Sequence, residues 1–155
     1  MRVEYINPFV EAAFTVLKEV LGTEVKRGEL YLKSTTMPVM GVAALVGLAG
    51  DVEGRVLFDM SKGTALAVAG AMNGEEFSAL DELAKATITE LANMITAQAV
   101  TKLHDLGFKF DLTPPALFTG ENMEISNREV EALIVPMDID SVGKIEINVA
   151  IRERL

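Results

Sequence analysis

The sequence predicts an α+β fold in which about three helices pack on a mainly antiparallel sheet. Three observations support this class. Residues 80–99 repeat apolar side chains at helical spacing, which indicates a long helix with one face toward a core. Residues 144–152 alternate apolar and polar side chains, as a half-buried antiparallel strand does. A helix followed by strands occurs twice along the chain, which is consistent with an internal duplication.

The first helix is expected to begin at Asn7 and to end at Gly22. Asn7 has the side chain of an N-cap, and Pro8 fits the first helical position, where its missing N–H is not needed. A glycine commonly ends a helix because it adopts the left-handed conformation without strain.

Three strands are predicted after this helix, over residues 24–34, 38–49 and 52–60. Gly50 and Asp51 form the turn between the last two, which therefore make a hairpin. The middle strand is almost wholly apolar, so we expect it to be covered on both faces.

Two helices follow in the middle of the chain. The first runs over residues 61–73 and is short and alanine-rich. Ser78 and Asp81 have the spacing of a capping box, which predicts the start of the long helix at Ser78. The long helix should end near residue 105, before Leu106 and Gly107.

The last part of the chain reads as strands. They are expected over residues 108–112, 116–119, 130–137 and 144–152, within one domain that spans residues 1–155. Pro136 cannot donate a hydrogen bond to a neighbouring strand, so we expect it at an edge or a bulge.

Composition excludes several classes of protein. The chain has 155 residues, a formal net charge of −9 and no cysteine. No cluster of Lys and Arg is present for binding nucleic acid. No apolar run approaches the ~20 residues that span a bilayer, and no signal peptide is recognisable at the N-terminus. We therefore expect a cytoplasmic protein with neither nucleic acid nor membrane as a partner.

Polar side chains gather at one place on the long helix. Glu90 and Asn93 lie three residues apart, on a face of otherwise small residues: Ala86, Thr89, Thr96 and Ala97. Small side chains allow another protein's backbone to approach closely. We interpret the face as a docking surface with two projecting polar groups. The alternative is that the pair arose by chance and meets only water.

Other kinds of catalytic machinery are not recognisable. His104 is the only histidine, and it lies ~16 Å along the helix axis from Asn93. Asp138 and Asp140 lie near a turn, where aspartates usually bind local backbone. The sequence therefore predicts neither a metal site nor a Ser-His-Asp triad.

Five segments identify a family. Residues 7–12, 90–95, 98–99, 114–115 and 118–120 resemble the CheC/CheX/FliY family of chemotaxis phosphatases, and the likeness spans nearly the whole chain. The family removes the phosphoryl group from the aspartate of the response regulator CheY. The resemblance therefore implies a hydrolase, a protein aspartyl-phosphate phosphatase, with phosphorylated CheY as its partner.

The family motif falls on Glu90 and Asn93, which the resemblance implies to be the catalytic residues. Asn93 would orient the attacking water in line with phosphorus, and Glu90 would contact the regulator's active-site lysine. Ala86, Thr89 and Ala97 would form the docking floor. Ala86 stands where the family has an acidic residue or Ser, so that peripheral contact is lost. No cofactor is expected on this chain, since the regulator supplies its own Mg²⁺.

The resemblance also implies a homodimer formed through the sheet. Under the duplication, Glu11 and Phe14 correspond to Glu90 and Asn93. Phe14 cannot orient water, so we expect a single active site. Phe14 is then a remnant of a lost site, a core residue, or both.

Two other functions remain open at this point. The chain could be a non-catalytic module that binds a response regulator or a flagellar-switch component through the same helix. It could also be a small-ligand-binding α+β domain, although no convergent set of polar residues indicates a pocket.

Overall fold

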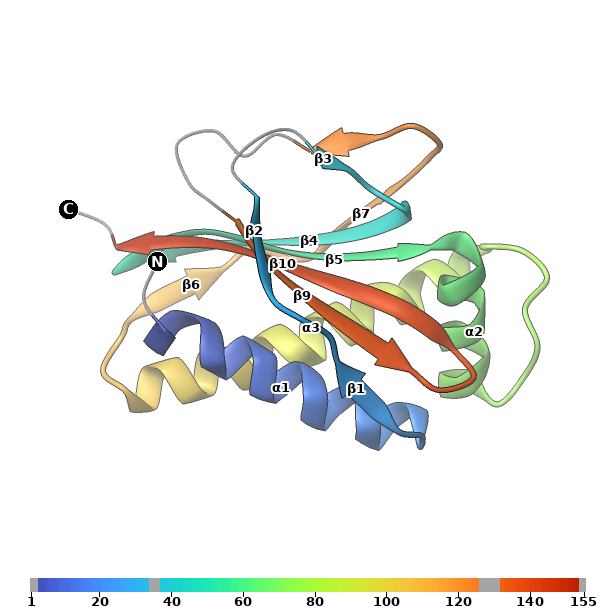
Figure 1. The fold of residues 1–155 in the computed structure, drawn as a ribbon, viewed down its shortest axis with the longest axis horizontal. Helices are drawn as coiled ribbons and strands as arrows, with labels where there is room; N and C mark the ends of the chain where they lie inside the picture. Colours follow the sequence, from blue (N-terminus) through green and yellow to red (C-terminus); the bar gives the residue numbers. More distant parts are fainter. Residues whose placement is uncertain (1–2, 34–36, 126–131, 154–155) are drawn as a thin grey trace.

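The fold has the predicted α+β class. The computed structural model describes residues 3–33, 37–125 and 132–153. These residues form three helices and an eight-stranded antiparallel sheet, with a separate two-stranded ladder. In Figure 1 the helices lie below the sheet, whereas β3 lies above it. Most of the core lies between the helices and the sheet face that they cover.

Helix α1 begins earlier than predicted. It runs over Val3–Leu21, so Asn7 is not its N-cap and Pro8 lies inside it. Tyr5 and Phe9 are almost fully buried, and the Tyr5 ring packs edge-on against Phe108 with 5.0 Å between ring centroids. Burial of this apolar turn offsets the hydrogen bond that Pro8 cannot make.

The starts of the other two helices follow local capping. Ser61 accepts a hydrogen bond from the Thr64 N–H and caps α2, as expected for a helix starting there. The predicted start of the long helix at Ser78 is wrong, because Asp81 itself is the N-cap and accepts from the Ala84 N–H at 2.9 Å. The bounds are Lys62–Asn73 for α2 and Glu82–Asp105 for α3.

The strands confirm most of the predicted positions. The hairpin of β4 and β5 turns at Asp51, and the strand expected over residues 116–119 is present as β7. Residues 130–131 of the strand expected over 130–137 lie outside the described residues. The strands are β1 Val25–Arg27, β2 Tyr31–Lys33, β3 Met37–Pro38, β4 Gly41–Gly50, β5 Val52–Ser61, β6 Phe110–Leu112, β7 Ala116–Thr119, β8 Glu124–Ile125, β9 Ala132–Ile139 and β10 Gly143–Glu153.

The order of the strands is symmetric about the centre of the sheet. The main path is β1-β9-β10-β5-β4-β6, with β2 also paired to β9 and β7 also paired to β4. Strands β1 and β2, from the first half of the chain, therefore pair with β9 of the second half. Strands β6 and β7, from the second half, pair with β4 of the first half, and β5 meets β10 at the centre. This layout agrees with the duplicated unit indicated by the sequence. Among the described residues, α2 has no counterpart.

The predicted strand over residues 24–34, of which residue 34 lies outside the described residues, is divided in two. Pairing of β1 and β2 with β9 breaks between them, where the Gly28 N–H donates to the Pro136 carbonyl at 2.8 Å. Pro136 thus lies at a bulge, as its missing donor requires. The related break between β6 and β7 has the Thr113 N–H donating to the Gly47 carbonyl at 3.0 Å.

One face of strand β4 is covered, as predicted, whereas the other face is covered only in part. Val42, Ala44 and Val46 are buried in the main core, while Leu45 on the opposite face is only half-buried. No helix in the described part of the chain is both long and apolar enough to cross a membrane.

Candidate functional site

Helix α3 presents one narrow exposed stripe. It packs against α1, α2, β4 and β7, which cover most of its circumference. Its buried side includes Ile88, Leu91 and Ile95, each at most 2% exposed. Six exposed residues recur at intervals of three or four and form the α3 stripe: Leu83, Ala86, Glu90, Asn93, Ala97 and Thr101.

The predicted catalytic residues lie together on this stripe. Glu90 and Asn93 are both exposed and are one helical turn apart, so their side chains project from the same face. Ala86 and Ala97 flank them and are also exposed. A partner can therefore reach both polar groups across two alanines without meeting a long side chain.

The two threonines of the predicted face are less accessible. Thr89 is half-buried, and its hydroxyl donates to the Lys85 carbonyl at 2.9 Å. Thr96 is fully buried and donates to the Ala92 carbonyl at 2.7 Å, so its placement on the exposed face was wrong. The packing of α3 on several elements buries flanking positions that an isolated helix would expose.

Hydrogen bonds hold the first turns of α3 against the end of α2. The Asn73 side-chain amide donates to the Thr87 hydroxyl at 2.8 Å, and that hydroxyl donates to the Leu83 carbonyl at 2.8 Å. Thr87 is buried. The stripe is thus presented on a backbone fixed at its N-terminal end.

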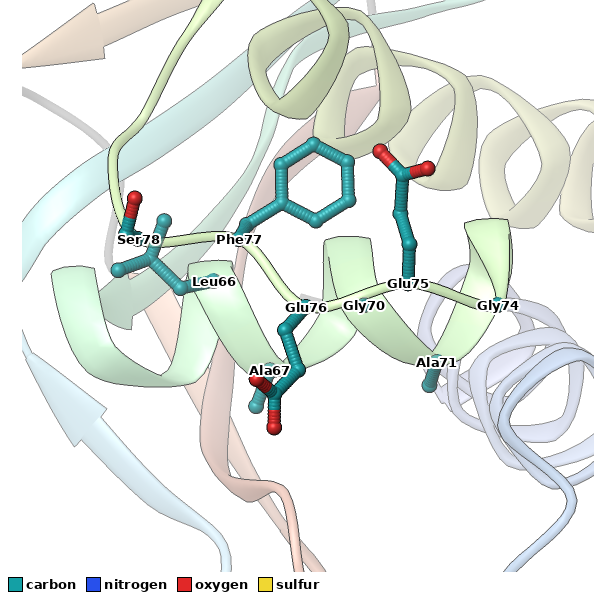
Figure 2. Close-up of a pocket in the computed structure, with 9 residues that line it drawn as sticks. All are labelled: Leu66, Ala67, Gly70, Ala71, Gly74, Glu75, Glu76, Phe77 and Ser78. Atoms are coloured by element: carbon teal, nitrogen blue, oxygen red, sulfur yellow. The ribbon is translucent and has the colours of Figure 1, made fainter.

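A groove lies beside this junction. It has a volume of about 770 Å³ and is formed by α2 and the loop that follows it, and neither Glu90 nor Asn93 lines it. Figure 2 shows Phe77 and Glu75 projecting from the loop on one side and Glu76 on the other. The predicted catalytic pair is exposed on the α3 stripe and lies outside this groove.

Metal-binding side chains are not grouped in the part of the chain that is described. There, no three residues of the His, Cys, Asp or Glu types are placed to hold an ion. His104 is exposed near the C-terminal end of α3, and Asp138 and Asp140 are exposed at the end of β9.

Helix α1 has a corresponding stripe with different residues. Glu11 on it forms an ion pair with Lys102 of α3 at 2.8 Å. Phe14 is 37% exposed, so the alternative that it is simply a core residue is wrong. The Lys18 ammonium lies 5.7 Å from the centre of the Phe14 ring. The position that matches Asn93 thus carries an exposed aromatic ring beside a cation.

Sequence reasoning missed a polar cluster on the sheet face away from the helices. Asp59 of β5 is 3% exposed and accepts from the Met40 N–H at 2.8 Å. Burial, reinforced by the neighbouring Glu146, raises the pKa of Asp59 to about 6. Glu146 accepts a hydrogen bond from the Tyr31 hydroxyl, and burial followed by Glu146 raises the pKa of Tyr31 to about 12. The signal available in the sequence was an aspartate inside the apolar run of residues 56–60.

The family model and a curated relative identify one family. Residues 42–138 match the family described as chemotaxis phosphatase CheX. The CheY-P phosphatase CheX of Thermotoga maritima is 30% identical over 153 residues, which cover 98% of each chain.

Solved structures give the same result. The chain is similar to one chain of the crystal structure of the CheX-CheY-BeF₃-Mg²⁺ complex from Borrelia burgdorferi, with 47% identity and a TM-score of 0.87. That alignment covers 98% of this chain and 100% of the other. It is also similar to the chemotaxis protein CheX of Desulfovibrio desulfuricans, with 26% identity, a TM-score of 0.85 and coverage of 98% and 100%.

Proposed function

Since the chain belongs to the CheX family of chemotaxis phosphatases, we propose that Asn93 and Glu90 act together on the phosphorylated aspartate of a CheY response regulator. Family membership makes the chain a CheY-P phosphatase, a hydrolase that acts on phosphoaspartate. The observation that carries the assignment of residues is the α3 stripe, where the two polar groups stand one turn apart between exposed alanines.

The reaction needs little chemistry from this chain. An aspartyl phosphate is an activated mixed anhydride. Water attacks phosphorus, the bond from phosphorus to the aspartate oxygen breaks, and the regulator recovers its carboxylate as inorganic phosphate leaves with the water's oxygen. A water held in line with the breaking bond is the part that a partner can add.

Asn93 is suited to hold that water. Its carboxamide has one acceptor oxygen and two donor hydrogens, so it can accept a hydrogen bond from the water and donate to a phosphoryl oxygen. It does not have to remove a proton. A ~100-fold acceleration requires only about 2.7 kcal/mol off the barrier, which positioning can supply.

Glu90 has a different role in this proposal. Its carboxylate, one turn from Asn93, would pair with the lysine in the regulator's active site and fix the register of the helix over the pocket. Ala86 and Ala97, with Thr89 at the edge, would let the walls of the pocket close around Asn93.

We further propose that Mg²⁺ arrives with the regulator. The B. burgdorferi complex contains CheX, CheY, BeF₃ and Mg²⁺, in which the beryllium fluoride stands in for the phosphoryl group. In this chain, the described acidic and histidine side chains form no group of three that would hold the ion. The ion, when bound, neutralises charge on the phosphoryl oxygens.

A homodimer is the proposed assembly. The sheet face away from the helices has an apolar recess of about 330 Å³, lined in part by Ala43, Leu45 and Leu57. Phe118 beside it is 49% exposed. A second copy could cover this surface, and light scattering after chromatography should then give twice the mass of one chain. A Phe118→Asp variant should shift that mass toward one chain.

Turnover separates the proposed function from a binding module. With the regulator in 50-fold molar excess, a phosphatase releases many equivalents of phosphate per chain, above the regulator's spontaneous loss. A module that only binds the regulator or a flagellar-switch component releases none. Binding without turnover would refute the catalytic role proposed for Asn93.

A further inference from the structure

The exposed stripes of α1 and α3 correspond residue by residue. Glu11 and Glu90 differ by 79 positions, and the same offset pairs Glu4 with Leu83 and Phe14 with Asn93. All six of these side chains are exposed. Each of these three exposed positions of α3 therefore has a matching exposed position on α1 that carries a different or identical residue. Comparing the two residues shows which side chains the fold accepts at that position.

Leu83 stands out in this comparison. Its side chain is 49% exposed, while the matching residue of α1 is the charged Glu4. The fold thus accepts a carboxylate at this place, so packing does not require a leucine there. Leu83 is the one large apolar side chain among the six residues of the α3 stripe, so it can contact a partner that covers the stripe.

Leu83 is also in line with the proposed catalytic pair. It lies ten residues before Asn93 on the same stripe, ~15 Å along the helix axis. Interfaces between proteins usually take in ~20 residues on each side, so a regulator that encloses Asn93 extends well beyond it. The exposed Ala86 lies between them and leaves the path along the helix open.

The position of Leu83 is fixed before any partner arrives. Its carbonyl accepts from the Thr87 hydroxyl, which in turn accepts from the Asn73 amide. The Asp81 cap lies two residues before it. An anchor on a fixed backbone loses little conformational freedom when it binds.

We propose that Leu83 is a specificity residue of this phosphatase: it packs on an apolar patch of the regulator that lies ~15 Å along the α3 axis from Asn93. It acts on recognition of the regulator and leaves the chemical step to Asn93. This inference rests on the proposed function, because it assumes that the regulator binds over the α3 stripe.

The test compares Leu83→Glu with Leu106→Glu. Leu106 is 58% exposed, caps the C-terminal end of α3 and is not part of the stripe, so it controls for an added carboxylate at an exposed leucine next to the same helix. Leu83→Ala provides a second, uncharged variant. Phosphate release is measured against regulator concentration, and the dissociation constant is measured with regulator loaded with BeF₃ and Mg²⁺.

Leu83→Glu should raise KM and the dissociation constant by about tenfold, or about 1.4 kcal/mol, with kcat unchanged. Leu83→Ala should raise both by about threefold, and Leu106→Glu should change neither. Equal constants for Leu83→Glu and the parent protein would overturn the inference while leaving the phosphatase intact. Absence of turnover in the parent protein would instead refute the proposed function, and the dissociation constants would still decide the role of Leu83.

Discussion

The Glu11 carboxylate of α1 lies 2.8 Å from the Lys102 ammonium of α3. This ion pair joins the two helices whose exposed stripes correspond, and it engages the carboxylate that matches Glu90. Phe14 occupies the position that matches Asn93 and has no group that can orient water. The two halves of the sheet are related by symmetry, but the exposed residues of α1 and α3 differ.

A single active site is the first prediction that follows. Phe14→Asn should change kcat/KM by less than about twofold, because Glu11 stays paired with Lys102 and Lys18 lies beside the new amide. Steady-state phosphate release from the phosphorylated regulator measures this. An additional, separately saturating activity in Phe14→Asn would show that α1 retains a working site.

The alanine floor can be tested by adding bulk. Ala97→Lys should lower kcat/KM at least ~10-fold, because a long cation one turn from Asn93 obstructs the regulator's pocket. The fold should accept it, since Lys18 occupies the matching position of α1. Melting temperature and phosphate release are measured together.

The matched control for that variant is Ala71→Lys, at an exposed alanine of α2 away from the stripe. It should leave the kinetics unchanged. Similar losses in both variants would indicate a general effect of the added charge and would remove the support for a docking floor.

Glu90→Ala should act mainly on binding. Loss of an exposed ion pair with the regulator's lysine is expected to raise KM by about fivefold, roughly 1 kcal/mol, with a smaller loss in kcat. The increase should shrink at high salt, because exposed charges are screened. Glu11→Ala, at the matching position of α1, is the control and should behave like the parent protein.

Asp59 should make stability depend on pH between its ordinary pKa of 3.8 and about 6. The folded state holds the proton more tightly than the unfolded state, so this contribution is fully present below pH 3.8 and is lost as the pH rises through about 6. Asp59→Asn cannot ionise and can still accept from the Met40 N–H.

Relative to the parent protein, Asp59→Asn should therefore gain up to about 3 kcal/mol in the free energy of unfolding between pH 4 and pH 7. Urea unfolding at a series of pH values measures this. Asp138→Asn, at an exposed carboxyl of β9, is the control. A parallel pH dependence in Asp59→Asn and the parent protein would contradict the assignment.

Periodic patterns in the sequence predicted the elements that position the site. The end of α3 and the alternation along β10 follow from the spacing of apolar residues, which is a local property. The start of α1 was wrong because burial of Tyr5 outweighs the local preference of Pro8 for a first turn. Local signals carry no information about that contact with Phe108.

The pairing of strands that are far apart in the sequence could not be predicted from local sequence patterns. Pairing of β1 with β9 joins residues more than a hundred positions apart, and its register depends on the bulge at Pro136. For the same reason, neither the ion pair of Glu11 with Lys102 nor the approach of Glu146 to Asp59 could be predicted. The proximity of Glu90 and Asn93 could be predicted, because the two residues are one helical turn apart.

The most direct test of the account is phosphate release from the phosphorylated regulator by Asn93→Ala, with the regulator in large excess. The side chain is exposed on α3, so the variant should fold and melt like the parent protein. We expect kcat to fall at least ~100-fold, while regulator loaded with BeF₃ and Mg²⁺ still binds. A folded Asn93→Ala that keeps the parent rate would contradict the central claim that this amide positions the attacking water.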